Sequence, residues 1–300
     1  MADGIINVYK EQGYTSHDVV AKMRGILKQK KIGHTGTLDP MAEGVLPVCL
    51  GKGTKLCDML TDKTKTYRAV LLLGMETDTQ DTTGTVLDEK PVTVTEEEVR
   101  EAVLSFQGEY DQIPPMYSAL KVDGKKLYEL ARAGKEVERK ARPVTILDIR
   151  VENIALPRAV ITVTCSKGTY IRTLCYDIGR KLGCGGCMES LIRTRVSGFE
   201  LEDSLKLSEI ERLKAEGTLD EHIVPIDAVF EEYPAVSTKP EFDRLVHNGN
   251  PCYLNQIAGN RKMEDGLFRV YDSAGQFIGV YEVDGESRML KPRKVFLGGN

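Results

Sequence analysis

Strand-like and helix-like segments follow one another irregularly along this chain of 300 residues, and this order constrains the fold more than any other feature. A series of βαβ units would repeat about every 30 residues, and the sequence has no such period. It also has no internal repeat and no low-complexity segment. The order of segments therefore predicts an α+β fold with a mixed, largely antiparallel central sheet and flanking helices.

Several elements can be assigned from local patterns. Apolar residues at helical spacing follow Ser16, and an acid-rich helix start follows Thr95. We expect the glycine-rich stretch 33–53 to be a loop, and strand 67–73 to pair with 84–87 across a polar turn. Further strands are expected at 146–154 and 159–165, and helices at 16–27, 96–106 and 170–182.

The pattern changes near residue 232. The preceding stretch, 203–232, is acidic and helical in character, and residues 200–243 hold thirteen acidic residues against four basic ones. Short strand-like runs that end in glycine or Asp-Gly turns follow, which is typical of a small β-barrel. We therefore divide the chain into residues 1–232 and 233–300, with a basic lobe at about 108–145. The strands expected in the second part are 267–271, 277–283, 288–290 and 295–297.

Composition excludes several classes of protein. The chain is 41% hydrophobic and 29% charged with a net charge of −4, as in ordinary globular proteins. No uncharged stretch is long and apolar enough for a membrane span, and the first residues do not form a secretory signal. Seven scattered cysteines are no disulfide framework, and Cys184 and Cys187 lack the second ligand pair of a zinc site. We expect a cytoplasmic protein without metal.

Basic residues gather in three segments, although the pI of the chain is about 5.8. The segments are 22–31, 121–142 and 288–300, and the second holds eight basic residues against four acidic ones. Each lies beside a glycine-rich or aromatic segment, which favours a polyanionic partner. For any one segment, a solvated charged surface is the alternative.

The main candidate for chemistry is the segment GHTGTLDPMAEGVLP at 33–47. Pro40 restricts the backbone of Asp39, and the flanking glycines let a ligand approach closely. A carboxylate there can act as a nucleophile or a base because it is already ionised at pH 7. A turn-forming aspartate is the alternative. The spacing to Gly51-Lys52 does not fit a P-loop.

Three further segments carry candidate binding residues. Tyr67 stands between basic residues and could stack on a base, although a packed strand tyrosine is the commoner arrangement. The turn KGTYIR at 167–172 opens a helix, so it could bind an anion, and Arg172 could pair with a carboxylate. A capping glycine is the alternative there. The segment LIRTRVSGF at 191–199 alternates apolar and basic residues, as a strand edge also does.

In this order the motifs resemble the bacterial TruB-type tRNA pseudouridine synthases, which convert uridine to pseudouridine at position 55 in the T loop of tRNA. The resemblance covers nearly the whole chain and departs at Tyr9-Lys10-Glu11, where Asp-Lys-Pro is usual. The matching segments are GYTSHD at 13–18, GHTGTLDP at 33–40, KTYRA at 65–69, GMETDTQDTTG at 74–84, QIPPMYSALKVDGKKLYELAR at 112–132, SKGTYIRTL at 166–174 and LIRTRVSGF at 191–199.

The resemblance implies a role for each matching residue. Asp39 would be the nucleophile that attacks the target nucleotide, at the sugar or at the base. Tyr67 would stack on the target base, with removal of a sugar proton as a second role, and Arg172 would pair with Asp39. His34 would fill the gap left by the flipped nucleotide. The other matching positions would line the pocket or support RNA contact and loop order: Tyr170, Leu191, Lys55 and Asp81.

The resemblance also implies that no cofactor and no metal is needed, because the same base is re-attached through carbon. The basic lobe would cover the T arm, and residues 233–300 would resemble a PUA domain that reaches elsewhere on the tRNA. A non-catalytic tRNA-binding or tRNA-folding protein is the alternative, in which Asp39, Tyr67 and Arg172 would be dispensable. A hydrolase that uses Asp39 would want a second carboxylate or a histidine, and only His34 lies near in sequence. We expect a monomer.

Overall fold

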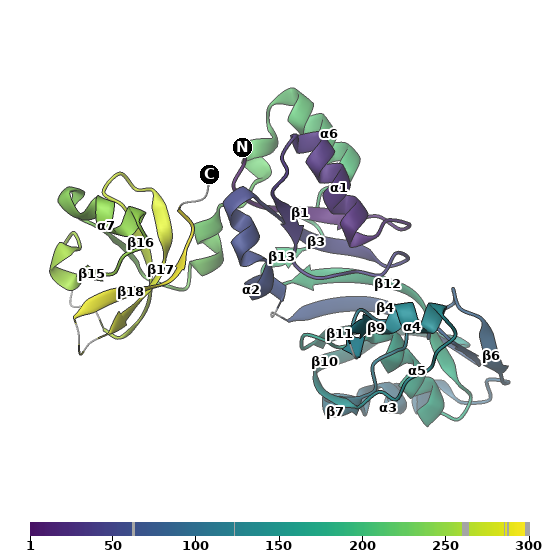
Figure 1. The fold of residues 1–300 in the computed structure, drawn as a ribbon. Helices are drawn as coiled ribbons and strands as arrows, with labels where there is room; N and C mark the ends of the chain where they lie inside the picture. The colour runs from purple at the N-terminus through teal and green to yellow at the C-terminus, as the bar shows by residue number, and fades with distance from the viewer. Residues whose placement is uncertain (62–63, 123, 260–263, 285, 287, 298–300) are drawn as a thin grey trace.

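The computed structural model describes residues 1–61, 64–122, 124–259, 264–284, 286 and 288–297, which form a large and a small sheet with helices around them (Figure 1). In the large sheet neighbouring strands are antiparallel, except that the third strand across it runs parallel to the second. The predicted α+β fold with a mixed, largely antiparallel sheet is thus confirmed. The order across the sheet is β1 (Gly4–Lys10), β3 (Glu43–Leu50), β12 (Gly186–Val196), β4 (Lys65–Leu73), β11 (Arg158–Cys165), β10 (Arg142–Ala155) and β7 (Gly108–Gln112), with β2 (Ile32–His34) beside β3 and β13 (Phe199–Glu200) beside β12.

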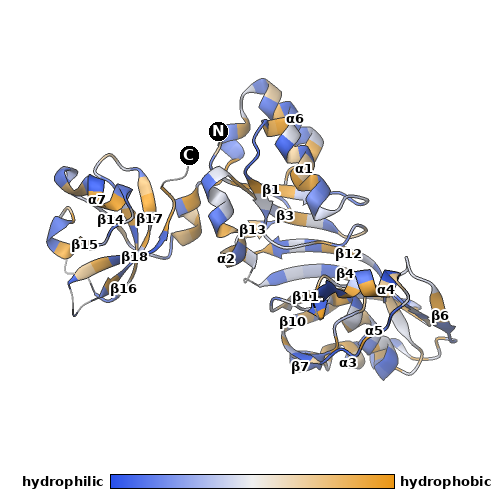
Figure 2. Ribbon diagram, viewed as in Figure 1, coloured by the Kyte–Doolittle hydropathy of each residue, from blue (hydrophilic) through white to orange (hydrophobic). Residues whose placement is uncertain are grey.

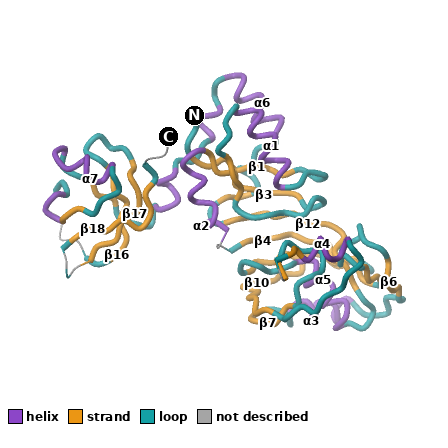
Figure 3. Tube along the Cα trace, viewed as in Figure 1, coloured by secondary structure: helices purple, strands orange, loops and turns teal. Residues whose placement is uncertain are grey.

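Helices lie at the periphery of the strands (Figure 3). Helices α1 (Ser16–Leu27) and α6 (Leu207–Glu216) contact each other near β1, whereas α3 (Glu96–Leu104) and α5 (Ile171–Lys181) pack near β10 and β12. Their ribbons carry both apolar and polar residues, as expected of helices with one buried face (Figure 2). The helices predicted at 16–27, 96–106 and 170–182 are therefore confirmed within two residues at each end.

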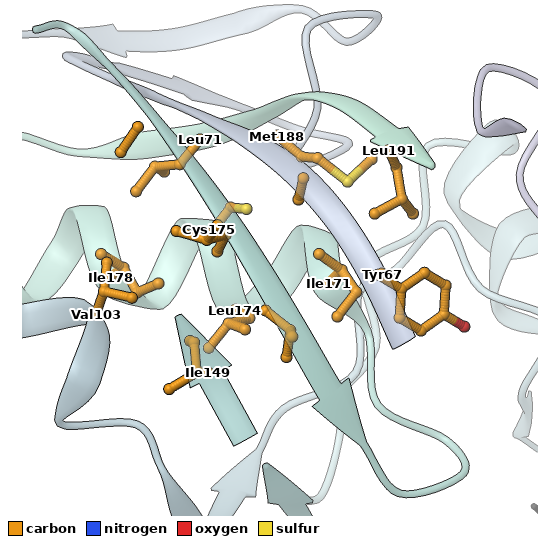
Figure 4. Close-up of a cluster of buried hydrophobic side chains, with 14 of the residues drawn as sticks. Tyr67, Leu71, Val103, Ile149, Ile171, Leu174, Cys175, Ile178, Met188 and Leu191 are labelled. Carbon is orange, nitrogen blue, oxygen red and sulfur yellow. The ribbon is translucent and has the colours of Figure 1, made fainter. Parts of the chain in front are cut away.

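Two apolar clusters hold the helices to the large sheet. One lies between α3, α5 and the strands from β12 to β10, and Figure 4 shows part of it, including Leu71, Leu174 and Ile178. The other lies between α1, α6 and the strands β1 and β3, and includes Val8 and Met23. Each buried aliphatic side chain contributes about 1.5–3 kcal/mol relative to exposure, so these clusters fix the sheet on which the site is built.

The prediction that 33–53 is a loop is wrong for most of its length. Residues 43–50 form β3, which lies between β1 and β12 and is almost wholly buried. The glycines and Pro47 in this stretch look like loop residues in sequence, but the apolar side chains between them pack on both sides of the sheet. The true loop joins β2 to β3.

The predicted pairing of 67–73 with 84–87 is also wrong. Strand β4 lies between β11 and β12, and its neighbours come from distant parts of the chain. The segment near 84–87 forms β6 (Val86–Glu89), which pairs with β5 (Met75–Thr77) in a separate hairpin. Gly74, with φ of +89°, follows β4 and turns the chain away from the large sheet. The segment that comes next therefore pairs within its own hairpin and not with β4.

The small sheet begins after residue 234. Its order is β14 (Ala235–Ser237), β16 (Gly266–Tyr271), β17 (Phe277–Asp284), β18 (Met289–Val295) and β15 (Cys252–Tyr253), with the short helix α7 (Asp243–His247) beside it. The strands expected at 267–271 and 277–283 are confirmed. The strand expected at 288–290 is the beginning of β18, whereas the strand expected at 295–297 is wrong, because β18 ends at Val295. Pro292 interrupts the sequence pattern there but is tolerated next to a register shift in the ladder.

A third apolar cluster joins the two sheets. Phe230, in a short 3-10 helix (Ile226–Phe230), lies with its ring centroid 5.9 Å from that of Phe296 and 6.2 Å from that of Phe277. Ile5 and Leu56 of the first part belong to the same cluster. The small sheet is therefore packed against the large one through shared buried side chains.

The remaining elements are short. In the basic lobe two paired strands of two residues each are followed by a helix of six residues. Among all described helices, none is long and apolar enough to cross a membrane. These elements are α2 (Cys57–Thr61), β8 (Lys121–Val122), β9 (Lys125–Lys126), α4 (Leu127–Arg132) and the 3-10 helices Gly51–Leu56, Leu219–His222, Pro240–Phe242 and Leu254–Gln256.

Candidate active site

Asp39 lies on the loop between β2 and β3, with its side chain 42% exposed. The loop is held by the start of α1: Ser16 Oγ accepts a hydrogen bond from Leu38 N at 2.9 Å and donates one to Leu38 O at 3.4 Å. Ser16 is fully buried, and the Leu38 side chain is almost so. The residue before Asp39 is thus fixed by its backbone and its side chain, while the carboxylate faces outward.

Lys10, at the end of β1, holds the other side of this loop. Its Nζ donates to Pro40 O at 3.1 Å and to Ala42 O at 2.6 Å, and the side chain is fully buried. Burial lowers the pKa of Lys10 to about 8, although the charges of Glu43 and Asp39 act in the opposite direction. Lys10 is not among the site residues predicted from the sequence, because a lysine at a strand end carries no signal of its own.

Arg172 is brought to Asp39 by the first turn of α5. Its Nε lies 3.0 Å from Asp39 Oδ2, and its side chain is only 7% exposed. Nη1 lies 3.6 Å from Asp81 Oδ2 and donates to Thr79 O at 3.1 Å, and Nη2 donates to Tyr117 O at 2.8 Å. A guanidinium bonded in this way on several sides has a fixed orientation, so it also fixes the carboxylate that it pairs with.

Asp81 lies in the turn between β5 and β6 and orders that turn. Its Oδ1 accepts from Thr79 Oγ1 at 2.8 Å, from Thr83 N at 3.0 Å and from Thr83 Oγ1 at 2.5 Å. A carboxylate that accepts several hydrogen bonds from its own turn makes the turn rigid. Asp81 thus supports the backbone that binds Arg172.

Tyr67 and Leu191 lie on the adjacent central strands β4 and β12, and both are more than nine-tenths buried. The Tyr67 hydroxyl points away from the apolar cluster that holds its ring (Figure 4). Burial raises the pKa of Tyr67, the cation of Arg193 lowers it, and the charge of Asp39 raises it. The charge of Asp39 therefore acts on the Tyr67 hydroxyl.

Tyr170 is the residue before α5 and is half-buried. Its backbone is clamped by one side chain, since Tyr170 N donates to Gln112 Oε1 at 2.8 Å and Gln112 Nε2 donates to Tyr170 O at 3.0 Å. Burial raises the pKa of its phenol, against the effects of Arg172 and other groups. The charge of Asp39 also acts on this phenol, which places Tyr170 in the same cluster.

His34 is the last residue of β2, at the start of the Asp39 loop. Its Nδ1 accepts from Gly36 N at 3.2 Å, and its ring meets that of His17 edge-on with centroids 5.3 Å apart. Burial lowers the pKa of His34 to about 4, and the neighbouring His17 and the guanidinium of Arg193 act in the same direction. The imidazole is therefore neutral at pH 7.

Lys55 is not part of this cluster. It follows the opposite end of β3 and donates from Nζ to Val295 O of the small sheet at 2.8 Å. Burial lowers the pKa of Lys55, and so do the nearby charges of Lys31, Lys52 and Lys294. Lys55 therefore belongs to a group of lysines at the junction of the two sheets.

Arg193 is a second residue of the site that is not among those predicted from the sequence. It lies on β12 with its side chain 1% exposed, and donates from Nε to Val45 O at 2.7 Å and from Nη2 to Gly36 O at 3.2 Å. The alternation of apolar and basic residues at 191–199 was the available signal. The alternative of a strand edge is wrong, because β12 is an interior strand.

Potential metal ligands are scattered. Within the described ranges, no group of three or more His, Cys, Asp or Glu side chains is arranged to hold a metal ion. Cys184 and Cys187 are both free and buried.

Comparisons with known proteins identify the family of this chain. The family described as TruB family pseudouridylate synthase (N terminal domain) matches residues 24–171, and the tRNA pseudouridylate synthase B C-terminal domain matches residues 172–231. Proteins named tRNA pseudouridine synthase B are similar over nearly their whole lengths. That of Lachnoclostridium phytofermentans is 54% identical, covering 98% of this chain and 100% of the relative, and that of Clostridium kluyveri is 47% identical, covering 96% and 99%.

Two solved structures share the fold. An H/ACA RNP bound to a substrate RNA containing 2'-deoxyuridine has a chain with a TM-score of 0.71 and 26% identity, which covers 98% of this chain and 85% of that one. A chain of a Cbf5-Nop10-Gar1 complex has a TM-score of 0.71 and 28% identity, with the same coverage. The chain therefore belongs to the TruB family of pseudouridylate synthases.

Proposed function

We propose that this protein is a tRNA pseudouridine synthase that isomerises the uridine at position 55 in the T loop, with Asp39 as the nucleophile. One observation carries the proposal: Asp39 is exposed on a braced loop and is paired at 3.0 Å with the buried Arg172. An ionised carboxylate that is held in one orientation and open to solvent can attack a nucleotide without prior deprotonation.

The side chains around Asp39 fit a flipped nucleotide. Tyr67 offers a buried ring whose hydroxyl is influenced by the charge of Asp39, and Leu191 on the next strand offers an apolar contact. Tyr170, the residue before α5, is influenced by the same carboxylate charge. A neutral His34 can take the place of the extruded base in the RNA stack, because an uncharged ring stacks without a desolvation penalty for charge. Extrusion is easiest from a loop, which supports a T-loop substrate.

We further propose that the T arm is held between the large sheet and the basic lobe at about 108–145. The lobe contributes its backbone to the site, since Tyr117 O accepts from Arg172. Residues 233–300 would form a second, PUA-like RNA-binding unit after a catalytic unit of residues 1–232. The separate sheet of the second unit supports this division, and the lysines around Lys55 provide positive charge at the junction. We expect the enzyme to act as a cytoplasmic monomer.

The test compares the wild type with Asp39→Asn on an unmodified T-arm RNA. We expect the wild type to form pseudouridine, and the variant to bind the RNA with an unchanged Kd but to form none. Asp58→Asn, at an exposed aspartate of α2, is the matched control and should keep full activity. Binding without turnover by the wild type would favour the non-catalytic RNA-binding alternative. Turnover by Asp39→Asn would remove Asp39 from the mechanism.

A further inference from the structure

Arg193 carries a positive charge into the middle of the large sheet. Its side chain is 1% exposed, and among the described residues no carboxylate forms an ion pair with it. Burying a charge is costly unless hydrogen bonds or an opposite charge compensate it. An apolar residue at this position of β12 would avoid that cost. The buried guanidinium therefore points to a role other than stabilising the sheet.

Two of its hydrogen bonds brace the loop that carries Asp39. Nη2 donates to Gly36 O at 3.2 Å, before Asp39 in the chain, and Nε donates to Val45 O at 2.7 Å, after it. The backbone of Arg193 is equally constrained, because a side chain at Gly44 would meet Arg193 O at 2.3 Å. The guanidinium therefore has a fixed position relative to both ends of the loop.

The third partner is Tyr67. Arg193 and Tyr67 stand directly opposite each other in the β12–β4 ladder, so their side chains lie on the same face of the sheet. Both side chains are more than nine-tenths buried there, and that of Arg193 almost completely. A guanidinium only donates hydrogen bonds, so toward Arg193 the phenol oxygen of Tyr67 can act only as an acceptor. Burial raises the pKa of Tyr67, and Arg193 is the group that opposes this most.

We propose that Arg193 is a positioning residue for the reaction: its guanidinium fixes the phenol oxygen of Tyr67 and stabilises negative charge on it when Tyr67 acts as a base. The phenol gives its proton to solvent beforehand and takes up the sugar proton during the reaction, so the charge of Arg193 does not change. Arg193 itself does not touch the substrate. This inference rests on the proposed function and on the second role that the resemblance implies for Tyr67, the removal of a sugar proton.

The experiment is a double-mutant cycle with Arg193→Met and Tyr67→Phe, measured as single-turnover rates on unmodified T-arm RNA with saturating enzyme. Arg193→Met should lower the rate by about tenfold or more at pH 7, with a Kd for the RNA within about threefold of the wild type. In the Tyr67→Phe background the same change should cost less than about threefold. The loss in the first background should shrink as the pH rises, because a higher pH ionises the phenol without help.

Two further variants separate this role from loop bracing alone. Arg193→Lys keeps the buried charge and should recover part of the rate, and it also serves if Arg193→Met fails to fold. Arg195→Met alters an exposed arginine of the same strand that pairs with Glu200, and should leave the rate unchanged. An equal loss in both Tyr67 backgrounds, or a loss that does not depend on pH, would overturn the inference. Because the wild type is measured alongside, failure of the synthase assignment would show as no turnover in any sample.

Discussion

The guanidinium of Arg172 pairs with the Asp39 carboxylate through Nε and binds two backbone oxygens through Nη1 and Nη2. Those oxygens belong to Thr79, in the turn ordered by Asp81, and to Tyr117, in the basic lobe. One buried side chain thus connects the Asp39 loop, the β5–β6 turn and the lobe. A shift of any of the three changes the geometry at the carboxylate.

We expect Arg172→Lys to lower the single-turnover rate by about a hundredfold or more. Lysine keeps the charge, but its single ammonium cannot reach Asp39 and both backbone oxygens at once. The Kd for T-arm RNA should stay within about threefold of the wild-type value, since Arg172 is buried. Arg180→Lys, at an exposed arginine of the same helix, is the control and should have the wild-type rate. A wild-type rate for Arg172→Lys would show that charge alone is sufficient.

Ser16→Ala should lower the rate about tenfold, because the Leu38 backbone loses the hydroxyl that fixes it beside Asp39. The matched control is Thr15→Ala, which removes the cap of α1 in the same turn and touches no part of the loop. Loss of that cap should cost about 1 kcal/mol of stability and leave the rate unchanged. Thermal unfolding and single-turnover rates of both variants separate the two effects. Equal rate losses would mean that α1 acts only through its stability.

His34 makes the folded state sensitive to acid. Its pKa is about 4 in the fold, whereas an unfolded histidine has a pKa of about 6.5, so the unfolded chain binds the extra proton first as the pH falls. The contribution of His34 to stability is complete above pH 6.5 and is lost between 6.5 and 4. Urea unfolding at pH 7.5 and pH 5 should therefore show a larger loss for the wild type than for His34→Gln. His222→Gln, at an exposed histidine, should behave as the wild type.

The basic residues of the C-terminal strand should contribute unequally to RNA binding. Lys291 and Arg293 are already paired with Asp284 and Glu282 on β17, whereas Lys294 faces the lysine group of Lys55. We expect Lys294→Gln to reduce the salt dependence of RNA affinity by about one in log–log slope. Lys291→Gln and Arg293→Gln should reduce it by clearly less. Equal slopes for all three variants would show that RNA displaces the acidic partners.

Local patterns in the sequence were sufficient for the helices and for drawing attention to several residues of the candidate site. The capping residues near Ser16 and Thr95 and the helical spacing behind them predicted α1 and α3 correctly, because these signals act within a few residues. The motif around Asp39 and the turn before Arg172 also stood out, and the structure brings them together. Tyr67, Tyr170 and Leu191 join them from their own segments.

Long-range pairing could not be predicted in the same way. Strand β4 prefers partners about ninety or more residues away to the nearby hairpin, and only the packed sheet decides between them. Lys10 and Arg193 were not predicted as site residues for a related reason. A lone basic residue in a strand looks exposed until the tertiary structure surrounds it. Lys55 was placed with the site by resemblance, and the structure puts it at the junction of the sheets.

The shared apolar cluster at that junction has a consequence for how the chain can be divided. Ile5 and Leu56 are buried in the same apolar cluster as Phe230 and Phe296. Each sheet therefore has apolar side chains on the side that faces the other, and only the contact between the sheets keeps them from water. A fragment that ends near residue 232 would expose these side chains to water, where such patches promote aggregation. The two units should therefore unfold in a single cooperative transition. The packing between them also fixes the distance between the two units, and with it the length of RNA that they can contact together.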